Sequence, residues 1–188
     1  APIHSEWIKG GGQDVTDEIS RLFLARQGTA ENLKLRYGAA LAETGDDNRQ
    51  IEVPRIGDGS GEVFEYRSKL TQMMQRVYEQ QLTKVVQHLQ AAGFAAYVGQ
   101  RVVLTGGASQ VERLTLLAEK VMGADIRLGD PKGITGLPEN ARGPAFATCV
   151  GILKFAHQYR QTAPRKSKRG RQSGGALSRL FEWARESF

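Results

Sequence analysis

The chain has 188 residues, 40% hydrophobic and 24% charged, so it can bury a core and is neither collagen-like nor wholly disordered. Its single cysteine excludes an internal disulfide, and neither a signal peptide nor a spanning run of about 18 apolar residues is present. We therefore expect a cytoplasmic protein with at most peripheral membrane contact. The net charge of +6 equals the six basic residues of segment 160–171, which has no acidic residue.

The first elements predicted along the chain are a strand and two helices. Residues 3–8 alternate as a strand does, and the glycines at 10–12 interrupt the pattern. Acidic residues near position 14 predict a helix over about 14–24. Residues 30–37 predict a second helix, with Gly38 as a left-handed stop.

The middle of the chain predicts a hairpin followed by a long helix. Residues 51–56 and 63–66 are expected to be antiparallel strands joined by a glycine-rich loop. Apolar residues recur at helical spacing over 68–92 and predict one long helix with a single apolar face. We interpret its methionines as core residues rather than a cofactor site.

The next part alternates strands and helices. Strand 101–104, a glycine turn and a helix are followed by strand 125–128, and Pro144 opens a further helix that ends near Tyr159. This alternation predicts an α/β fold with a parallel or mixed sheet flanked by helices. We expect Cys149 to be a small buried hydrophobe.

Two features could contact a ligand. The turn Thr105-Gly106-Gly107-Ala108 follows a strand, where α/β sheets place ligands, and its glycines would let a purine approach the backbone. It could equally be a tight connection. Glu31 and Lys34 share one helix face and could hold a nucleotide, although a surface ion pair has the same spacing. The scattered histidines predict no metal site.

The end of the chain predicts a membrane-binding helix. Residues 176–188 form an amphipathic pattern after the basic linker 160–175, in which we expect no fixed structure. The predicted lipid-facing residues are Leu177, Leu180, Phe181, Trp183, Ala184 and Phe188. Docking on the protein body or on a partner is the alternative. The adjacent cations favour an anionic membrane, since each contributes about 1 kcal/mol near such a surface.

Taken together, these segments resemble FtsA, the actin-like bacterial cell-division protein. The resemblance covers most of the chain, including the terminal helix. Its carriers are residues 11–19, 30–38, 103–108, 126–129, 133–137 and 144–153.

The resemblance implies the second lobe of an actin-like (ribonuclease H-like) α/β fold. Residues 1–38 and 100–159 would form the large subdomain, and residues 39–99 an inserted small α+β subdomain. ATP, with Mg²⁺ in the full-length protein, would contact Glu31, Lys34 and the turn formed by Thr105, Gly106, Gly107 and Ala108.

The resemblance also implies partners. The inserted subdomain would receive the acidic C-terminal peptide of FtsZ through Arg76, with Arg67, Lys69 and Lys84 around it. Other implied partners are further copies of the protein in a filament, divisome proteins and the anionic membrane at the septum, but no nucleic acid. The family's phosphate loops are absent, so we expect this chain to be part of a larger protein and not to hydrolyse ATP.

Three alternatives remain open at this point. A sugar or acetate kinase could share the fold, and so could another actin-like scaffold such as a pilus-assembly ATPase. A nucleic-acid-binding module using residues 160–171 is the third.

Overall fold

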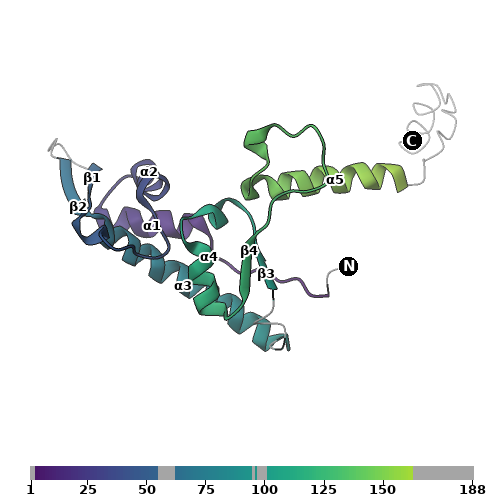
Figure 1. Cartoon of the computed structure of the whole chain (residues 1–188), viewed down its shortest axis with the longest axis horizontal. Helices are drawn as coiled ribbons and strands as arrows, with labels where there is room; N and C mark the ends of the chain where they lie inside the picture. The colour runs from purple at the N-terminus through teal and green to yellow at the C-terminus, as the bar shows by residue number, and fades with distance from the viewer. Residues whose placement is uncertain (1–2, 55–61, 95, 97–100, 163–188) are drawn as a thin grey trace, which may run out of the picture. The chain divides into compact units, whose positions relative to one another are not determined.

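The computed structural model describes residues 3–54, 62–94, 96 and 101–162 (Figure 1). Chain contacts define two units, Ala1–Leu153 and Lys154–Phe188. All elements below belong to the first unit, except that the last helix continues into the second. The predicted terminal helix and most of the linker lie outside the described residues.

Two short helices begin the fold. Helix α1 (Gly12–Phe23) buries Val15, Thr16 and Ile19. Helix α2 (Gln27–Tyr37) packs on α1 and begins three residues earlier than residue 30, the predicted start. Both predicted helices are therefore confirmed.

The predicted strand at residues 3–8 is wrong. These residues have no regular structure, and the side chains of Ile3 and Trp7 are 85% and 80% exposed. Alternation makes a strand possible, but a strand also needs a neighbour that accepts its backbone hydrogen bonds. None of the strands in the described chain pairs with this segment.

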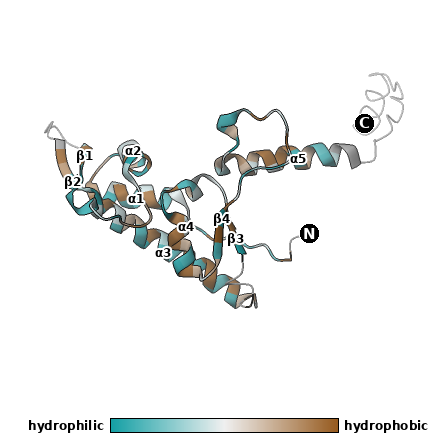
Figure 2. Ribbon diagram, in the orientation of Figure 1, coloured by the Kyte–Doolittle hydropathy of each residue, from teal (hydrophilic) through white to brown (hydrophobic). Residues whose placement is uncertain are grey.

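The hairpin and the long helix are confirmed. Strand β1 (Gln50–Pro54) pairs antiparallel with β2 (Glu62–Tyr66), and the predicted loop between them lies outside the described residues. Ile51 and Val53 face the core from alternate positions. Helix α3 (Arg67–Ala91) follows at once, carries hydrophobic and hydrophilic residues along its length (Figure 2), and buries Met74 completely.

A parallel strand pair forms the second sheet. Strand β3 (Arg101–Leu104) pairs with β4 (Asp125–Leu128), and helix α4 (Leu114–Met122) connects them. Helix α4 packs on both α3 and β4, so the apolar sides of these elements share one core. The prediction of a parallel or mixed sheet is met by this parallel pair, although each sheet in the described chain has two strands.

The core centres on α3. Leu70, Met74, Tyr78 and Leu82 recur every four residues and form one buried stripe. Val15 and Ile19 of α1 and residues of α2, β1, α4 and β4 join the same cluster. Helices α1 and α4 both pack against α3.

The last helix is present, but it begins at Ala147 rather than at Pro144, and it exposes its cysteine. A short 3-10 turn, η5 (Pro144–Phe146), leads into α5 (Ala147–Thr162). Cys149 is exposed, so its predicted burial is wrong. Between residues 147 and 153 only Val150 is buried, because the other sides of this part of α5 have no covering element in the described chain.

Candidate functional site

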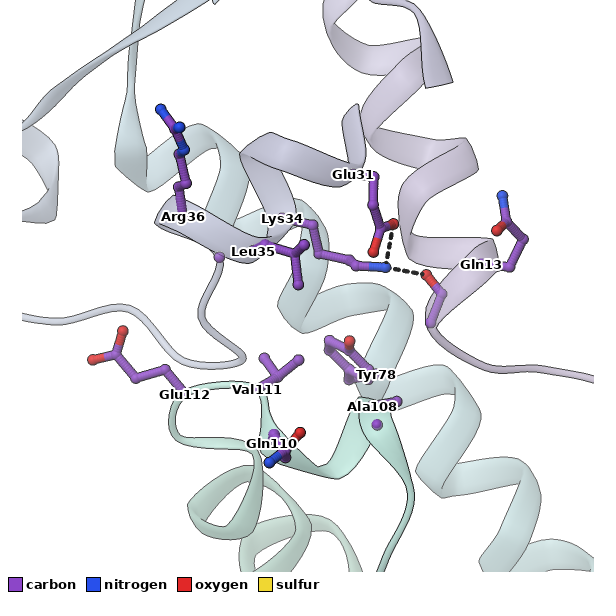
Figure 3. A pocket seen from close by; sticks show the side chains of 13 residues that line it. Gln13, Glu31, Lys34, Leu35, Arg36, Tyr78, Ala108, Gln110, Val111 and Glu112 are labelled. Atoms are coloured by element: carbon purple, nitrogen blue, oxygen red, sulfur yellow. Dashed lines mark hydrogen bonds and ion pairs between the residues drawn. The ribbon is translucent and has the colours of Figure 1, made fainter. Parts of the chain in front are cut away.

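A pocket of about 600 Å³ opens between α2 and the segment that follows β3 (Figure 3). The start of α1 contributes Gly12, α2 contributes Glu31, Lys34 and Leu35, and α3 contributes Tyr78. The opposite wall includes Gly107, Ala108, Val111 and Glu112. The structure thus brings the helix pair Glu31–Lys34 and part of the glycine turn, which are far apart in sequence, to one cavity of ligand size.

Glu31 and Lys34 form the polar side of this pocket. Lys34 Nζ donates to Glu31 Oε2 at 2.6 Å, to Thr16 Oγ1 at 2.8 Å and to the Gly12 carbonyl at 3.1 Å. An ammonium group has three N–H donors, and all three of those on Lys34 are hydrogen-bonded to protein atoms. Its side chain is 11% exposed. Lys34 therefore fixes Glu31 and the start of α1 relative to each other.

The Glu31 carboxylate keeps acceptor capacity for a ligand. Oε2 receives Lys34 and the Thr16 hydroxyl at 2.5 Å, while no described residue donates to Oε1. These hydrogen bonds, from Lys34 first and Thr16 second, lower the pKa of Glu31 against the opposing effect of burial. The carboxylate is consequently ionised at neutral pH and can accept hydrogen bonds from hydroxyl groups.

Within the glycine turn, some residues line the pocket and others stabilise the turn itself. Gly106 has a φ of 92°, a conformation that glycine adopts readily, and Gly107 faces open space, since a Cβ there would meet no atom within 4 Å. Gly107 and Ala108 line the pocket. Thr105 instead braces the turn, donating to the Gly129 carbonyl at 2.8 Å.

The helix after this turn does not begin directly at the glycines. A 3-10 turn, η3 (Gly107–Gln110), follows the glycines, and α4 starts only at Leu114 after Arg113 in a left-handed conformation. Ser109 Oγ donates to the Gly106 carbonyl at 2.7 Å and favours the tight turn. The first N–H groups of α4 therefore belong to a segment beyond the glycine turn.

Sequence reasoning missed Tyr78. It belongs to the apolar stripe of α3, so its spacing indicated only a core residue. The side chain is 3% exposed, yet it lines the pocket, and its hydroxyl has no hydrogen-bond partner. Burial raises the pKa of Tyr78 to about 12, and the nearby Glu31 carboxylate contributes to the rise.

The predicted basic residues of α3 lie in three different environments. Arg67 is 4% exposed and forms ion pairs with Asp46 at 2.6 Å and Glu112 at 2.9 Å. Its guanidinium is therefore neutralised within the protein. Lys69 pairs with Glu65 at 3.1 Å. Arg76 and Lys84 are exposed.

Arg76, Gln80 and Lys84 are each four residues apart and share one face of α3. All three line two grooves of about 380 and 400 Å³. Asp14 and Glu18 of α1 line the first groove as well. The surface is therefore mixed in charge, with Arg76 and Lys84 as its cations.

The predicted membrane residues Leu177, Leu180, Phe181, Trp183, Ala184 and Phe188 lie outside the described residues. Within the described part, no helix combines the length and apolarity that crossing a bilayer requires. The same part holds no group of three His, Cys, Asp or Glu side chains suited to a metal ion.

Comparison with solved structures defines the class of protein. The structure described as MreB5 of Spiroplasma citri bound to ADP matches 84% of this chain and 48% of its own length, with a TM-score of 0.57 and 15% identity. The fold is that of an actin-like lobe, and the pocket lies between its helices and the segment after β3.

The family is FtsA. The family model described as Cell division protein FtsA matches residues 1–151, and the chain belongs to this family. Relatives named Cell division protein FtsA include those of Agrobacterium fabrum (34% identity over 99% of this chain) and Escherichia coli K12 (31% over 98%). The match favours FtsA over the kinase and pilus-assembly alternatives. The chain spans 43% and 46% of these relatives' lengths.

Proposed function

We propose that this chain is the FtsZ-binding and membrane-anchoring part of an ATP-binding FtsA protein. It would hold the C-terminal peptide of FtsZ at the cytoplasmic face of the membrane, at the division septum. The observation that carries the proposal is an FtsA-family lobe with a ligand-sized pocket on one side of α3 and exposed cations on another. Self-association and contacts with other divisome proteins belong to the same proposal.

The nucleotide proposal rests on the geometry of the pocket. Glu31 Oε1 is suited to the hydroxyls of a ribose, and the open space at Gly107 and Ala108 is suited to a flat base. Lys34 would act by holding Glu31 rather than by binding phosphate, because its donors are already used. The similar MreB5 structure is described as bound to ADP. ATP with Mg²⁺ is the nucleotide that we propose for the longer protein.

The FtsZ proposal rests on the exposed cations of α3. An acidic peptide lying along this helix would meet Arg76 and Lys84, with Gln80 between them as a hydrogen-bonding side chain. Lys69 lies on the same helix but would first have to leave Glu65. Arg67 supports the helix from inside and is not proposed to contact the peptide.

The membrane proposal rests on the sequence of residues 160–188. Six cations followed by an amphipathic helix would bind weakly to an anionic bilayer, and several tails on one filament would bind more strongly by avidity.

Vesicle co-sedimentation tests FtsZ-peptide binding and membrane anchoring in one experiment. A labelled FtsZ C-terminal peptide is mixed with the chain and anionic vesicles, and the pelleted chain and peptide are both measured. We expect the wild-type chain to carry the peptide into the pellet. Arg76→Glu should leave the chain on the vesicles but lose most of the peptide, because it reverses a central cation.

Two further variants complete the test. Deletion of residues 176–188 should remove both chain and peptide from the pellet. Lys120→Glu, an exposed charge reversal on α4, is the matched control and should behave like the wild type. Unchanged pelleting of the deletion variant would reject the anchor, and equal peptide recovery with Arg76→Glu would reject the peptide site.

A further inference from the structure

The hydroxyl of Tyr78 is buried without a hydrogen-bond partner at the floor of the pocket. Among the described residues, two buried side-chain oxygens have no partner, Tyr78 Oη and Thr71 Oγ1. Both belong to α3, but only Tyr78 lines the pocket. Figure 3 shows its ring between the Glu31–Lys34 pair and Ala108.

A buried hydroxyl without a partner destabilises the folded protein by about 1–3 kcal/mol, so such groups are uncommon in folded proteins. The hydroxyl would recover this energy if a bound molecule offered it an acceptor. Tyr78 is therefore a candidate ligand contact, whereas Thr71, which is 0% exposed and lies away from the pocket, is not.

The position of the hydroxyl indicates which ligand atom it would meet. Tyr78 and Glu31 line the same pocket, where Figure 3 shows the Tyr78 ring beside the Glu31–Lys34 pair. The Glu31 side chain is 42% exposed and that of Lys34 only 11%, so Glu31 is the member of the pair that a ligand in the pocket can reach. If ribose hydroxyls bind Glu31, the nearest hydrogen-bond acceptor on a purine is N3, which lies on the ribose side of the base.

We propose that the Tyr78 hydroxyl donates a hydrogen bond to N3 of a purine nucleoside whose ribose is held by Glu31. This inference rests on the proposed nucleotide binding and makes Tyr78 a specificity-determining residue of that site. A base that has carbon at this position cannot accept the hydrogen bond, so the Tyr78 hydroxyl does not increase its affinity.

The test measures the binding of three nucleosides to the whole chain by NMR titration. The probes are adenosine, 3-deazaadenosine, which lacks N3, and 7-deazaadenosine, which retains it. Tyr78→Phe should weaken the binding of adenosine and 7-deazaadenosine by about fivefold, the size expected for one hydrogen bond. The affinity of Tyr78→Phe for 3-deazaadenosine should equal that of the wild-type chain for the same nucleoside.

Thr71→Val is the matched control, because it also removes an unpartnered buried hydroxyl from α3. Both variants should raise the melting temperature of the ligand-free chain by a few degrees, since each removes a buried polar group without a partner. Only Tyr78→Phe should change nucleoside affinity. This contrast separates ligand contact from a general effect on the stability of α3.

The outcomes distinguish the two proposals. If the wild-type chain does not bind adenosine, nucleotide binding by this pocket fails and the Tyr78 contact fails with it. If the wild type binds but Tyr78→Phe binds equally well, the Tyr78 contact is rejected and the nucleotide proposal stands. An equal loss for all three nucleosides would also reject the bond to N3.

Discussion

Gly38 ends α2 at a point where a side chain has no room. Its φ of −72° and ψ of 137° are ordinary extended values, so the predicted left-handed stop is wrong. A Cβ there would press against the Lys34 carbonyl and lie 2.7 Å from Met74 Cε. The glycine is required because a Cβ has no room beside the Lys34 carbonyl of its own helix or beside Met74 of α3, which is 36 positions away in the sequence.

Gly38→Ala should therefore destabilise the chain by about 1–3 kcal/mol, because the added methyl group would clash with the Lys34 carbonyl and overpack the contact with Met74. Gly28→Ala is the control within the same helix, since a Cβ at Gly28 meets no atom within 4 Å. It should be neutral or stabilise by up to about 1 kcal/mol. Urea unfolding measures both changes, and a stable Gly38→Ala variant would contradict the packing argument.

Glu31 and Lys34 show what spacing could predict at this scale. Their separation of three residues correctly placed them on one helix face, and the ion pair at 2.6 Å follows from it. The sequence did not reveal that Thr16 and the Gly12 carbonyl complete the coordination of Lys34. These partners belong to α1, which is distant in sequence. Only the packed structure could therefore show that Lys34 bonds to protein atoms rather than to a ligand.

At the scale of elements, Arg67 joins four parts of the first unit. Its guanidinium contacts Asp46 in the turn η1 (Asp46–Asn48), the Tyr37 carbonyl at the end of α2, and Glu112 after η3. The backbone of Ala39 and Ala40 also meets Glu112, through a parallel bridge and a hydrogen bond of 2.8 Å. Arg67 thus connects the start of α3 with the pocket wall at Glu112.

Asp46→Ala should lower the free energy of unfolding by about 3–5 kcal/mol, because it leaves part of a buried guanidinium unpaired. The Asp46 and Arg67 side chains are each 5% exposed. Glu112→Ala removes the other carboxylate, whose side chain is 53% exposed, and should cost about 1 kcal/mol or less. Chemical unfolding of both variants is the measurement, and equal losses would show that burial does not decide the strength of these pairs.

The hairpin and α3 were predictable as elements, but the role of their junction was not. Alternation over 50–54 and the four-residue stripe of α3 depend on local periodicity, which the sequence displays directly. A basic residue at the start of a helix is usually solvated, and Arg67 was predicted among the surface cations. Its two acidic partners are 21 and 45 residues away, so no local pattern could show that it is buried.

At the scale of the whole molecule, the charge is unevenly distributed. The 20 basic residues outside segment 160–171 balance the 20 acidic residues of the chain. The net positive charge that would attract an anionic membrane therefore lies in segment 160–171. This distribution, together with the helical pattern of 176–188, is the basis of the membrane proposal.

In a Trp7→Phe background, Trp183 should be the sole tryptophan and its fluorescence should shift to the blue on anionic vesicles. Neutral vesicles, or about 0.5 M salt, should weaken the response because the attraction is electrostatic. Replacing Arg165, Lys166, Lys168 and Arg169 by glutamine should reduce binding more than tenfold at low salt. An unchanged spectrum on anionic vesicles would rule out lipid contact by this helix.

The sequence alone determined the α/β class, the positions of the major helices and strand pairs, and the FtsA family, because periodicity, turn residues and ordered motifs are local properties of a chain. Tertiary structure decided which groups meet. It buried Arg67, exposed Cys149, left residues 3–8 without strand partners and placed Tyr78 at the pocket floor. Burial and hydrogen-bond partners depend on contacts between distant segments, and a local sequence pattern does not contain them.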